Sequence, residues 1–391
     1  MGVCYGRLIH ITYTPRRMNL VVLGGYGEMG RVAVHHLLRT EAGDDITVVD
    51  AQERSLFDTD RVSYEHVNLD DRNAVTDLLE AFDCAANCAP FEYNLSITEA
   101  AISAETDIID FGTYDSGIVE AQLDLHKEAE KKDVSVVPGI GASPGLTNVL
   151  IRDAADHLDS VTDVSIRWTS QRPLTASPGL LATALEEPLL ERTQYIDGEW
   201  RTDSAPFTGA ESVEFADWET ITCYDVPHPE PITIPRFISD VNTVTVKGGW
   251  GESNELLRTV TELGLSRNEP VIQGITPREF ITEFLVEALD QSVESRFSLA
   301  ITATGLVDGD EVEYRYDVPS IGEGDCEKYP FPVIPVAIPT GVPMAIGTAF
   351  LTDGQVIEPG VLPPEAAFDA GAFVKEAREL IEICKSVEPA D

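Results

Sequence analysis

The stretch Asn19-Leu-Val-Val-Leu-Gly-Gly-Tyr-Gly-Glu-Met-Gly-Arg31 decides the fold of this chain. Its apolar start is typical of a buried strand, and the pattern Gly25-x-Gly27-x-x-Gly30 leads directly into an apolar-periodic helix. A strand, a glycine turn and a helix together let the backbone approach a pyrophosphate, which then meets the free N–H groups at the helix start. The sequence therefore predicts a dinucleotide site whose turn residues are Gly25, Tyr26, Gly27, Glu28, Met29 and Gly30.

A second strand, Ile46-Thr-Val-Val-Asp50, supports this interpretation because it ends in an acid 20 positions after Gly30. An acid at that place binds a ribose 2′-hydroxyl, which favours NAD over NADP as the cofactor. Arg54 follows closely and could meet a 2′-phosphate, so NADP stays possible. Asp70 could touch the adenine, although capping the next helix is equally plausible. Further cofactor contacts are expected at the end of a fourth strand, from Ala89 and Pro90.

The charge of the chain restricts its partners. Its 391 residues include 68 acids and 27 bases, which gives a net charge of −41 spread along the whole sequence. Such a surface keeps a protein in solution in concentrated salt, and it is typical of proteins from salt-accumulating halophiles. It also repels nucleic acid and anionic lipid, so we expect neither as a partner.

Other features of the composition are typical of a protein in a reducing, aqueous compartment. No run reaches the roughly 18 uncharged apolar residues of a membrane span. The six cysteines are scattered, and no Cys/His cluster has the spacing of a metal site. We therefore expect free thiols, no bound metal and a cytoplasmic location.

The alternation of elements predicts an α/β protein with two domains. Residues 18–145 fit a Rossmann-type doubly wound parallel sheet, because strands alternate with helices throughout. Residues 146–340 contain short strands that alternate apolar and polar side chains, which predicts a second α/β domain with a mostly antiparallel sheet. Residues 341–391 are expected to be helices that return to the first domain. Residues 1–17 are interpreted as a disordered or mis-annotated extension.

The stretch Gly139-Ile-Gly-Ala-Ser-Pro-Gly-Leu-Thr-Asn148 resembles the saccharopine dehydrogenase family, with lysine 6-dehydrogenase the closer-looking member. The likeness continues at Phe91-Glu-Tyr-Asn94, Ile109-Asp-Phe-Gly112, Gly248-Gly-Trp-Gly-Glu252 and Thr340-Gly-Val-Pro-Met-Ala-Ile346. The resemblance implies a homodimer that oxidises a C–N bond of an amino acid, or reduces the imine, with NAD or NADP. Trp250 stands where lysine 6-dehydrogenases usually carry His, so lysine, saccharopine and a carboxyalkyl polyamine all stay open as substrates.

Several side chains are candidates for the chemistry. The resemblance places Ser143, Thr147 and Asn148 at the edge where substrate meets the nicotinamide. Amine oxidation also needs groups that hold the nitrogen and take its proton. The catalytic candidates are Asp110, at a strand end, Tyr93 and His228, the last in a proline-flanked loop. Asp110 could equally cap a turn, Tyr93 could be a half-buried aromatic, and His228 could be structural.

Two arginines could bind substrate carboxylates. Arg172 and Arg236 flank the long loop of the second domain, and a guanidinium binds a carboxylate through two parallel hydrogen bonds. Both could equally be ion-pair partners on an acidic surface. Lysine carries one carboxylate and two ammonium groups, so the acidic character of the chain favours a cationic amino acid over the tricarboxylate saccharopine.

Two other classes of protein compete with an oxidoreductase. One is a regulator that binds NAD without turnover, for which the departure at Trp250 leaves room. The other is a purely structural dimer, which the intact glycine pattern and Asp50 argue against.

Overall fold

The computed structural model describes residues 19–40, 45–54, 56–174, 178–271, 273–288 and 293–390. The expectation for Met1–Arg17 lies outside these residues. Within these ranges, none of the helices combines the length and apolarity of a membrane span.

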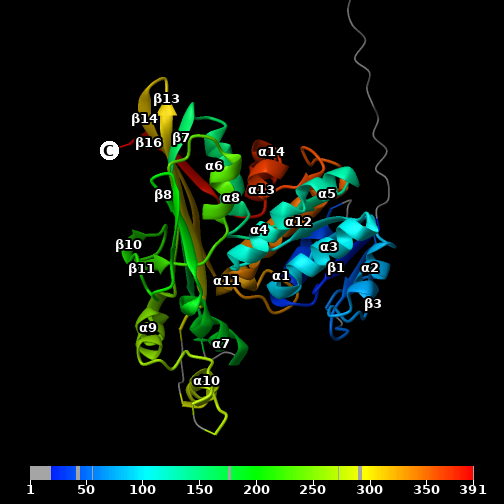
Figure 1. Cartoon of the computed structure of the whole chain (residues 1–391), viewed down its shortest axis with the longest axis horizontal. Coiled ribbons are helices and arrows are strands. Elements are labelled where there is room, and N and C mark those ends of the chain that lie inside the picture. The colour runs from blue at the N-terminus through cyan, green and yellow to red at the C-terminus, as the bar shows by residue number, and fades with distance from the viewer. Residues whose placement is uncertain are drawn as a thin grey trace, which may run out of the picture.

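A seven-stranded, fully parallel sheet forms one half of the molecule (Figure 1). Its strands follow the order β15-β6-β5-β4-β1-β2-β3, with β1 beside the middle of the sheet. The bounds are β1 (Leu20–Leu23), β2 (Ile46–Val49), β3 (Val62–Glu65), β4 (Cys84–Asn87), β5 (Asp107–Asp110), β6 (Ser135–Val137) and β15 (Gly360–Val361). The predicted Rossmann-type sheet is thereby confirmed, because the chain reverses its strand order between β1 and β4.

Helices cover both faces of this sheet. Side chains of β1 alternate between two cores: Leu20 and Val22 face α1 and α12, whereas Val21 and Leu23 face α2 and α3. The helices of this half are α1 (Glu28–Leu37), α2 (Arg72–Leu79), α3 (Asn94–Ala104), α4 (Ser116–Asp124), α5 (His126–Lys131) and α12 (Ala337–Thr352). Gly341 allows the close crossing of α12 and α1, since a Cβ atom there would lie 2.7 Å from the Cβ of Val32.

The second sheet has nine strands and is antiparallel except where β12 pairs with β7, which confirms the predicted mostly antiparallel sheet. The main path is β10-β11-β12-β7-β13-β14-β16, with β8 and β9 paired beside β12. The strands are β7 (Ser160–Gln171), β8 (Arg192–Ile196), β9 (Glu199–Asp203), β10 (Glu211–Glu214), β11 (Thr220–Asp225), β12 (Thr243–Gly249), β13 (Arg296–Val307), β14 (Asp310–Gly322) and β16 (Cys384–Pro389).

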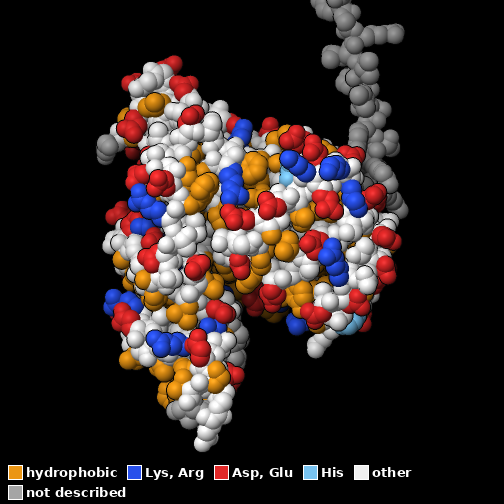
Figure 2. Space-filling model, viewed as in Figure 1, with side chains coloured by type: hydrophobic (Ala, Val, Ile, Leu, Met, Phe, Trp, Pro, Cys, Tyr) orange, Lys and Arg blue, Asp and Glu red, His pale blue; other side chains and the backbone are white. Residues whose placement is uncertain are grey.

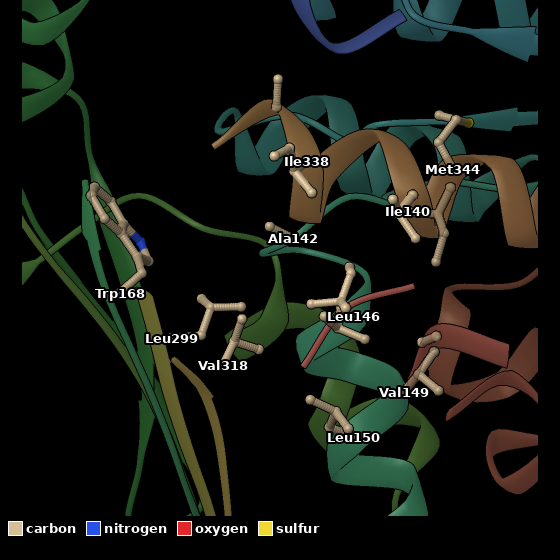
Figure 3. Packing of buried hydrophobic residues seen from close by; sticks show 14 of the residues in the cluster. Ile140, Ala142, Leu146, Val149, Leu150, Trp168, Leu299, Val318, Ile338 and Met344 are labelled. Carbon is tan, nitrogen blue, oxygen red and sulfur yellow. The ribbon is translucent and has the colours of Figure 1, made fainter. Parts of the chain in front are cut away.

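The remaining helices lie around the second sheet and between the two sheets. They are α6 (Leu146–Ala155), α7 (Pro178–Glu186), α8 (Glu230–Phe237), α9 (Asn254–Glu262), α10 (Pro277–Ala288), α11 (Glu323–Cys326), α13 (Pro364–Ala367) and α14 (Ala370–Arg378). Figure 1 shows α6 and α8 between the sheets and α10 at one end of the molecule. One core joins the two halves of the molecule, because Leu146 and Leu150 of α6 pack between Leu299 of the second sheet and Met344 of α12 (Figure 3).

The end of the chain differs from the expectation of helices returning to the first domain. α12 packs on α1 as expected, but residues 384–389 form strand β16 at the edge of the second sheet. Lys385 explains this placement, because its Nζ atom lies 2.9 Å from Asp153 Oδ2 and near the rings of Tyr314 and Tyr316.

Acidic side chains are dispersed over the face shown in Figure 2 and do not gather into one patch. This distribution agrees with the spread of acids along the sequence.

Candidate functional site

A cavity of about 860 Å³ lies at the carboxyl ends of the parallel strands and reaches the second sheet. Ligands of open α/β sheets bind in this position, where the strand order reverses. The first-sheet side is lined by residues that follow β1 to β6, among them Gly27, Asp50, Asn68, Pro90, Thr113 and Ser143. The second-sheet side is lined by Trp168, Ser170, Arg172, Glu187, His228, Trp250 and Phe297.

The glycine turn has the shape that a pyrophosphate requires. A Cβ atom on Gly30 would lie 2.3 Å from the carbonyl oxygen of Gly24, so only glycine lets α1 start this close to β1. Glu28, Met29 and Gly30 form the first turn of α1, where the amides have no partner inside the helix, and all three line the cavity. These free amides and the helix dipole fit the phosphates of a dinucleotide.

Asp50 lies at the end of β2 and also lines the cavity. Its Oδ2 accepts a hydrogen bond from the Tyr26 amide at 3.1 Å, and its Oδ1 accepts one from the Ala51 amide at 2.8 Å. The carboxylate is therefore fixed against the glycine turn, and its remaining lone pairs fit ribose hydroxyl groups.

The other predicted cofactor residues divide into two groups. Ala89 and Pro90 line the cavity, as do Gly27 and the first turn of α1. Gly25, Tyr26 and Asp70 do not line it. The ring of Tyr26 is buried beside Phe57 and Tyr64, while Asp70 is exposed and accepts a hydrogen bond from Tyr93 at 3.3 Å.

Aromatic rings form the walls of the second-sheet side of the cavity. Trp168 on β7 meets Trp250 edge to face, with ring centroids 5.7 Å apart. The imidazole of His228 lies between Trp168, at 6.0 Å, and Tyr114, at 5.4 Å. These rings leave His228 only 5% exposed, and low exposure to water strengthens the interactions of a charged group.

His228 is held by a buried carboxylate. Its Nδ1 lies 3.2 Å from Glu230 Oε2 and 3.3 Å from Ser143 Oγ, and the Ser143 hydroxyl donates to Glu230 Oε1 at 2.5 Å. His228 is 5% exposed and Glu230 is fully buried. Because Nδ1 is occupied, Nε2 is the imidazole nitrogen left for a ligand in the cavity.

The charge state of Glu230 follows from its partners. Burial raises the pKa of Glu230, but the charge of His228 and hydrogen bonds from His228 and Ser143 outweigh it and leave the pKa below its ordinary value. Thr147 adds a hydrogen bond to Glu230 Oε1 at 3.0 Å. Glu230 is thus an anion that orients the imidazole of His228.

Thr147 and Asn148 lie behind the site, buried and away from the cavity lining. The Asn148 side-chain amide donates to Glu365 Oε2 at 2.9 Å, and its Oδ1 accepts from the Gly145 amide at 2.8 Å. Of the three residues predicted on this edge, Ser143 alone lines the cavity. Thr147 and Asn148 instead hold in place the start of α6 and the loop that carries Ser143.

Sequence reasoning missed Glu187, which opens a short 3-10 turn (Glu187–Leu189) after α7. Glu187 lines the cavity with 9% of its surface exposed, and its Oε1 atom has no hydrogen-bond partner among the described residues. Burial raises the pKa of Glu187 to about 7, although His228 and Arg172 act to lower it. An acid in the sequence Glu186-Glu187-Pro188 gives no local signal, and its place depends on the folding of β7 and α7.

Three other predicted site residues, Arg172, Arg236 and Tyr93, lie in different places relative to the cavity. Arg172 follows β7 and lines the cavity, whereas Arg236 lies outside it and pairs with Glu120 at 2.7 Å. Tyr93 lines the cavity on the cofactor side, with its hydroxyl directed to Asp70.

Asp110 is buried and does not line the cavity. Its Oδ1 accepts hydrogen bonds from the amides of Gly112 at 2.6 Å and Gly139 at 3.0 Å, and its Oδ2 accepts one from Gln122 at 2.8 Å. Burial raises the pKa of Asp110 despite these hydrogen bonds. The carboxylate therefore ties together the loops after β5 and β6, and it has no direct path to a ligand.

One family model and two solved structures are similar to this chain. Residues 20–137 match the family model described as the saccharopine dehydrogenase NADP binding domain. Apo saccharopine dehydrogenase (L-Glu forming) from Saccharomyces cerevisiae superposes with a TM-score of 0.69 at 15% identity, covering 94% of this chain and 100% of that chain. Dihydrodipicolinate reductase from Paenisporosarcina sp. TG-14, bound to dipicolinate, gives a TM-score of 0.39 at 10% identity, over 89% of this chain and 98% of that chain.

The resemblance to the saccharopine dehydrogenase family and the NAD(P) cofactor are both confirmed by these matches. Residues 20–137 therefore match the NADP binding domain of the saccharopine dehydrogenase family, and the chain shares the fold of a saccharopine dehydrogenase.

Proposed function

We propose that the chain oxidises the C–N bond of an amino acid, with NAD as the electron acceptor. One observation carries the proposal: a single cavity joins the dinucleotide cradle to a histidine that a buried glutamate orients. When bound, NAD supplies the acceptor for a hydride from the carbon that bears the nitrogen. The rest of the chemistry falls to this chain's own residues.

His228 is proposed to take the proton of the amine. A C–N bond is oxidised from the neutral amine, so an ammonium substrate must first give up a proton. Glu230 occupies Nδ1 of His228, and Nε2 is then the atom that accepts the proton inside the cavity. A positioned base of this kind contributes about 10²–10⁴-fold to the rate. Once that proton has passed to solvent, the same nitrogen can take a proton from the water that adds to the imine.

Asp50 supports NAD rather than NADP as the cofactor. Its carboxylate lines the cavity and would repel a 2′-phosphate. Arg54, the candidate partner for such a phosphate, is not among the residues that line the cavity.

The homodimer and the cytoplasmic location implied by the sequence remain predictions. Exposed apolar side chains on and near α9 and α10, among them Leu263, Phe280 and Phe284, are candidates for a subunit contact. Sedimentation analysis of the wild-type protein and of a Phe280→Ser, Phe284→Ser variant tests whether these residues hold two chains together.

A spectrophotometric screen tests the proposed reaction. NADH formation is followed at high salt and alkaline pH with lysine, saccharopine, ornithine and carboxyalkyl polyamines. Turnover of an amino acid, lost in His228→Asn with NADH binding intact, would support the proposal. Turnover of a polyamine alone would change the substrate class. Tight NADH binding with no turnover would favour the regulator.

A further inference from the structure

We infer that Glu187 and Arg172 form a subsite for the zwitterionic end of an amino acid, with Glu187 binding its ammonium group and Arg172 its carboxylate. The inference rests on the proposed function and deepens it, because it names the charge pattern that a substrate needs. No role for Glu187 follows from the glycine turn or from the contact between His228 and Glu230.

One carboxylate oxygen of Glu187, Oε1, has no partner among the described residues. Glu187 is buried to more than nine-tenths of its surface, and it lines the cavity. A buried polar atom without a partner costs stability, so such atoms are kept where a ligand supplies the missing hydrogen bond. The ligand must donate hydrogen bonds, because an ionised carboxylate can only accept them.

The charged side chains on the second-sheet side of the cavity match a zwitterion. Both carboxylate oxygens of Glu230 already have hydrogen-bond partners inside the protein, in His228, Ser143 and Thr147. Arg172 and Glu187 are the other charged side chains of the second-sheet lining, and they influence each other electrostatically. One cation and one anion match a ligand that carries one carboxylate and one ammonium. A tricarboxylate such as saccharopine would leave carboxylates without partners in a cavity whose described lining holds a single arginine.

The cavity wall that includes Glu187 is rich in aromatic rings. Trp168, Trp250 and Tyr114 line the cavity together with Glu187. Aromatic faces attract ammonium groups, and the attraction grows when water is excluded. The wall therefore favours a cation beside Glu187 over a neutral group of the same size.

The pH dependence of binding follows from the neighbours of Glu187. Arg172 and His228 both favour its ionised form, whereas burial does not, and Glu187 in turn raises the pKa of the Tyr114 hydroxyl. With the pKa of Glu187 at about 7 in the empty protein, an ammonium ligand binds more tightly as the pH rises through that value. A ligand without an ammonium group does not gain in this way.

A set of three ligands with the same carbon chain tests the subsite without requiring turnover. Binding to the NADH complex is measured by calorimetry for L-norleucine, for hexanoate, which lacks the ammonium, and for hexylamine, which lacks the carboxylate. In Glu187→Gln, we expect norleucine and hexylamine to bind at least about tenfold more weakly, with hexanoate unchanged. In Arg172→Gln, we expect norleucine and hexanoate to bind more weakly and the affinity for hexylamine to stay unchanged.

Controls separate the subsite from a structural role. Glu191→Gln removes an exposed acid from the same segment and should change none of the affinities. Glu187→Asp keeps the charge and should recover part of the affinity for norleucine. NADH binding, unchanged in every variant, reports that the fold is intact.

Equal losses for all three ligands in Glu187→Gln, or no measurable binding of norleucine to the wild-type complex, would overturn the inference. Because binding is measured directly, the outcome is distinct from the test of the reaction. If binding depends on Glu187 but no substrate is turned over, the subsite is retained and the proposed oxidation is rejected. If a substrate is turned over but binding does not depend on Glu187, the oxidation is retained and the subsite is rejected.

Discussion

His228 Nδ1 lies 3.2 Å from Glu230 Oε2, and both residues are buried at the boundary between the two sheets. Pro229 alone separates them in the sequence, and the second of them begins α8. The short connection therefore fixes the imidazole against a carboxylate and directs Nε2 away from it. This pair is the basis for assigning the proton transfer to His228.

His228→Asn is expected to lower kcat by about 10²–10⁴-fold, because it removes the proton acceptor and leaves the glycine turn unchanged. Steady-state kinetics with the substrate from the screen, together with an NADH titration, measure the two effects separately. His157→Asn is the matched control, since His157 lies beside Asp153 and Tyr314, outside the cavity lining. A His228→Asn enzyme with wild-type kcat would exclude this residue as the base.

Asp50→Ser is expected to raise the use of NADP relative to NAD by about tenfold or more, because like charges placed together cost several kcal/mol. The ratio of kcat/KM for the two cofactors gives the result. Glu53→Ser is a useful control, as it removes an exposed acid of the same loop that does not line the cavity. Tighter binding of NADPH than of NADH by the wild-type protein would show that the assignment of NAD is wrong.

The buried carboxyl of Glu365 makes the stability of the protein depend on pH. Burial raises the pKa of Glu365 to about 7 from an ordinary value of 4.5. Its contribution to folding is therefore complete below the ordinary pKa and is lost as the pH rises through about 7. Gln at this position keeps a hydrogen-bond acceptor for Asn148 and cannot ionise.

Glu365→Gln should thus become more stable than the wild type as the pH rises, with the difference in unfolding free energy growing by up to about 3 kcal/mol. Denaturant unfolding at a series of pH values checks this, with the exposed Glu358→Gln as the control. A difference that stays constant with pH would contradict the burial argument.

Folding is expected to need salt. With a net charge of −41, the acids repel one another, and the screening length shortens from about 10 Å at 0.1 M to about 3 Å at 1 M salt. The melting temperature should therefore rise steeply over this range, as thermal unfolding in KCl would show. An unchanged melting temperature after dialysis into dilute buffer would refute the expectation.

The sequence was sufficient for the features that depend on local signals. The glycine turn, the acid at the end of β2 and the change from a parallel to a mostly antiparallel sheet all follow from short-range patterns that the packing reinforces. Strand β16 escaped prediction because its place depends on Lys385 meeting Asp153, far away in the sequence.

The candidate site was only partly predictable. A polar residue at a strand end can bind either a ligand or other groups of the protein, and its type does not say which. Asp110 and Arg236 both find protein partners, in the Gly112 and Gly139 amides and in Glu120. Glu187 gives no sequence signal, since the missing partner of its Oε1 atom is visible only when β7 and α7 are folded around the cavity.

The central claim is that an amino acid gives a hydride to NAD within this cavity. It is tested most directly with an amino acid deuterated at the carbon that bears the reacting nitrogen, by mass spectrometry of the NADH that forms. The account predicts that deuterium appears in the cofactor in step with the loss of the amine, and that His228→Asn abolishes this transfer while NADH still binds. Tight NADH binding, with no deuterium transferred from lysine, saccharopine or ornithine, would contradict it.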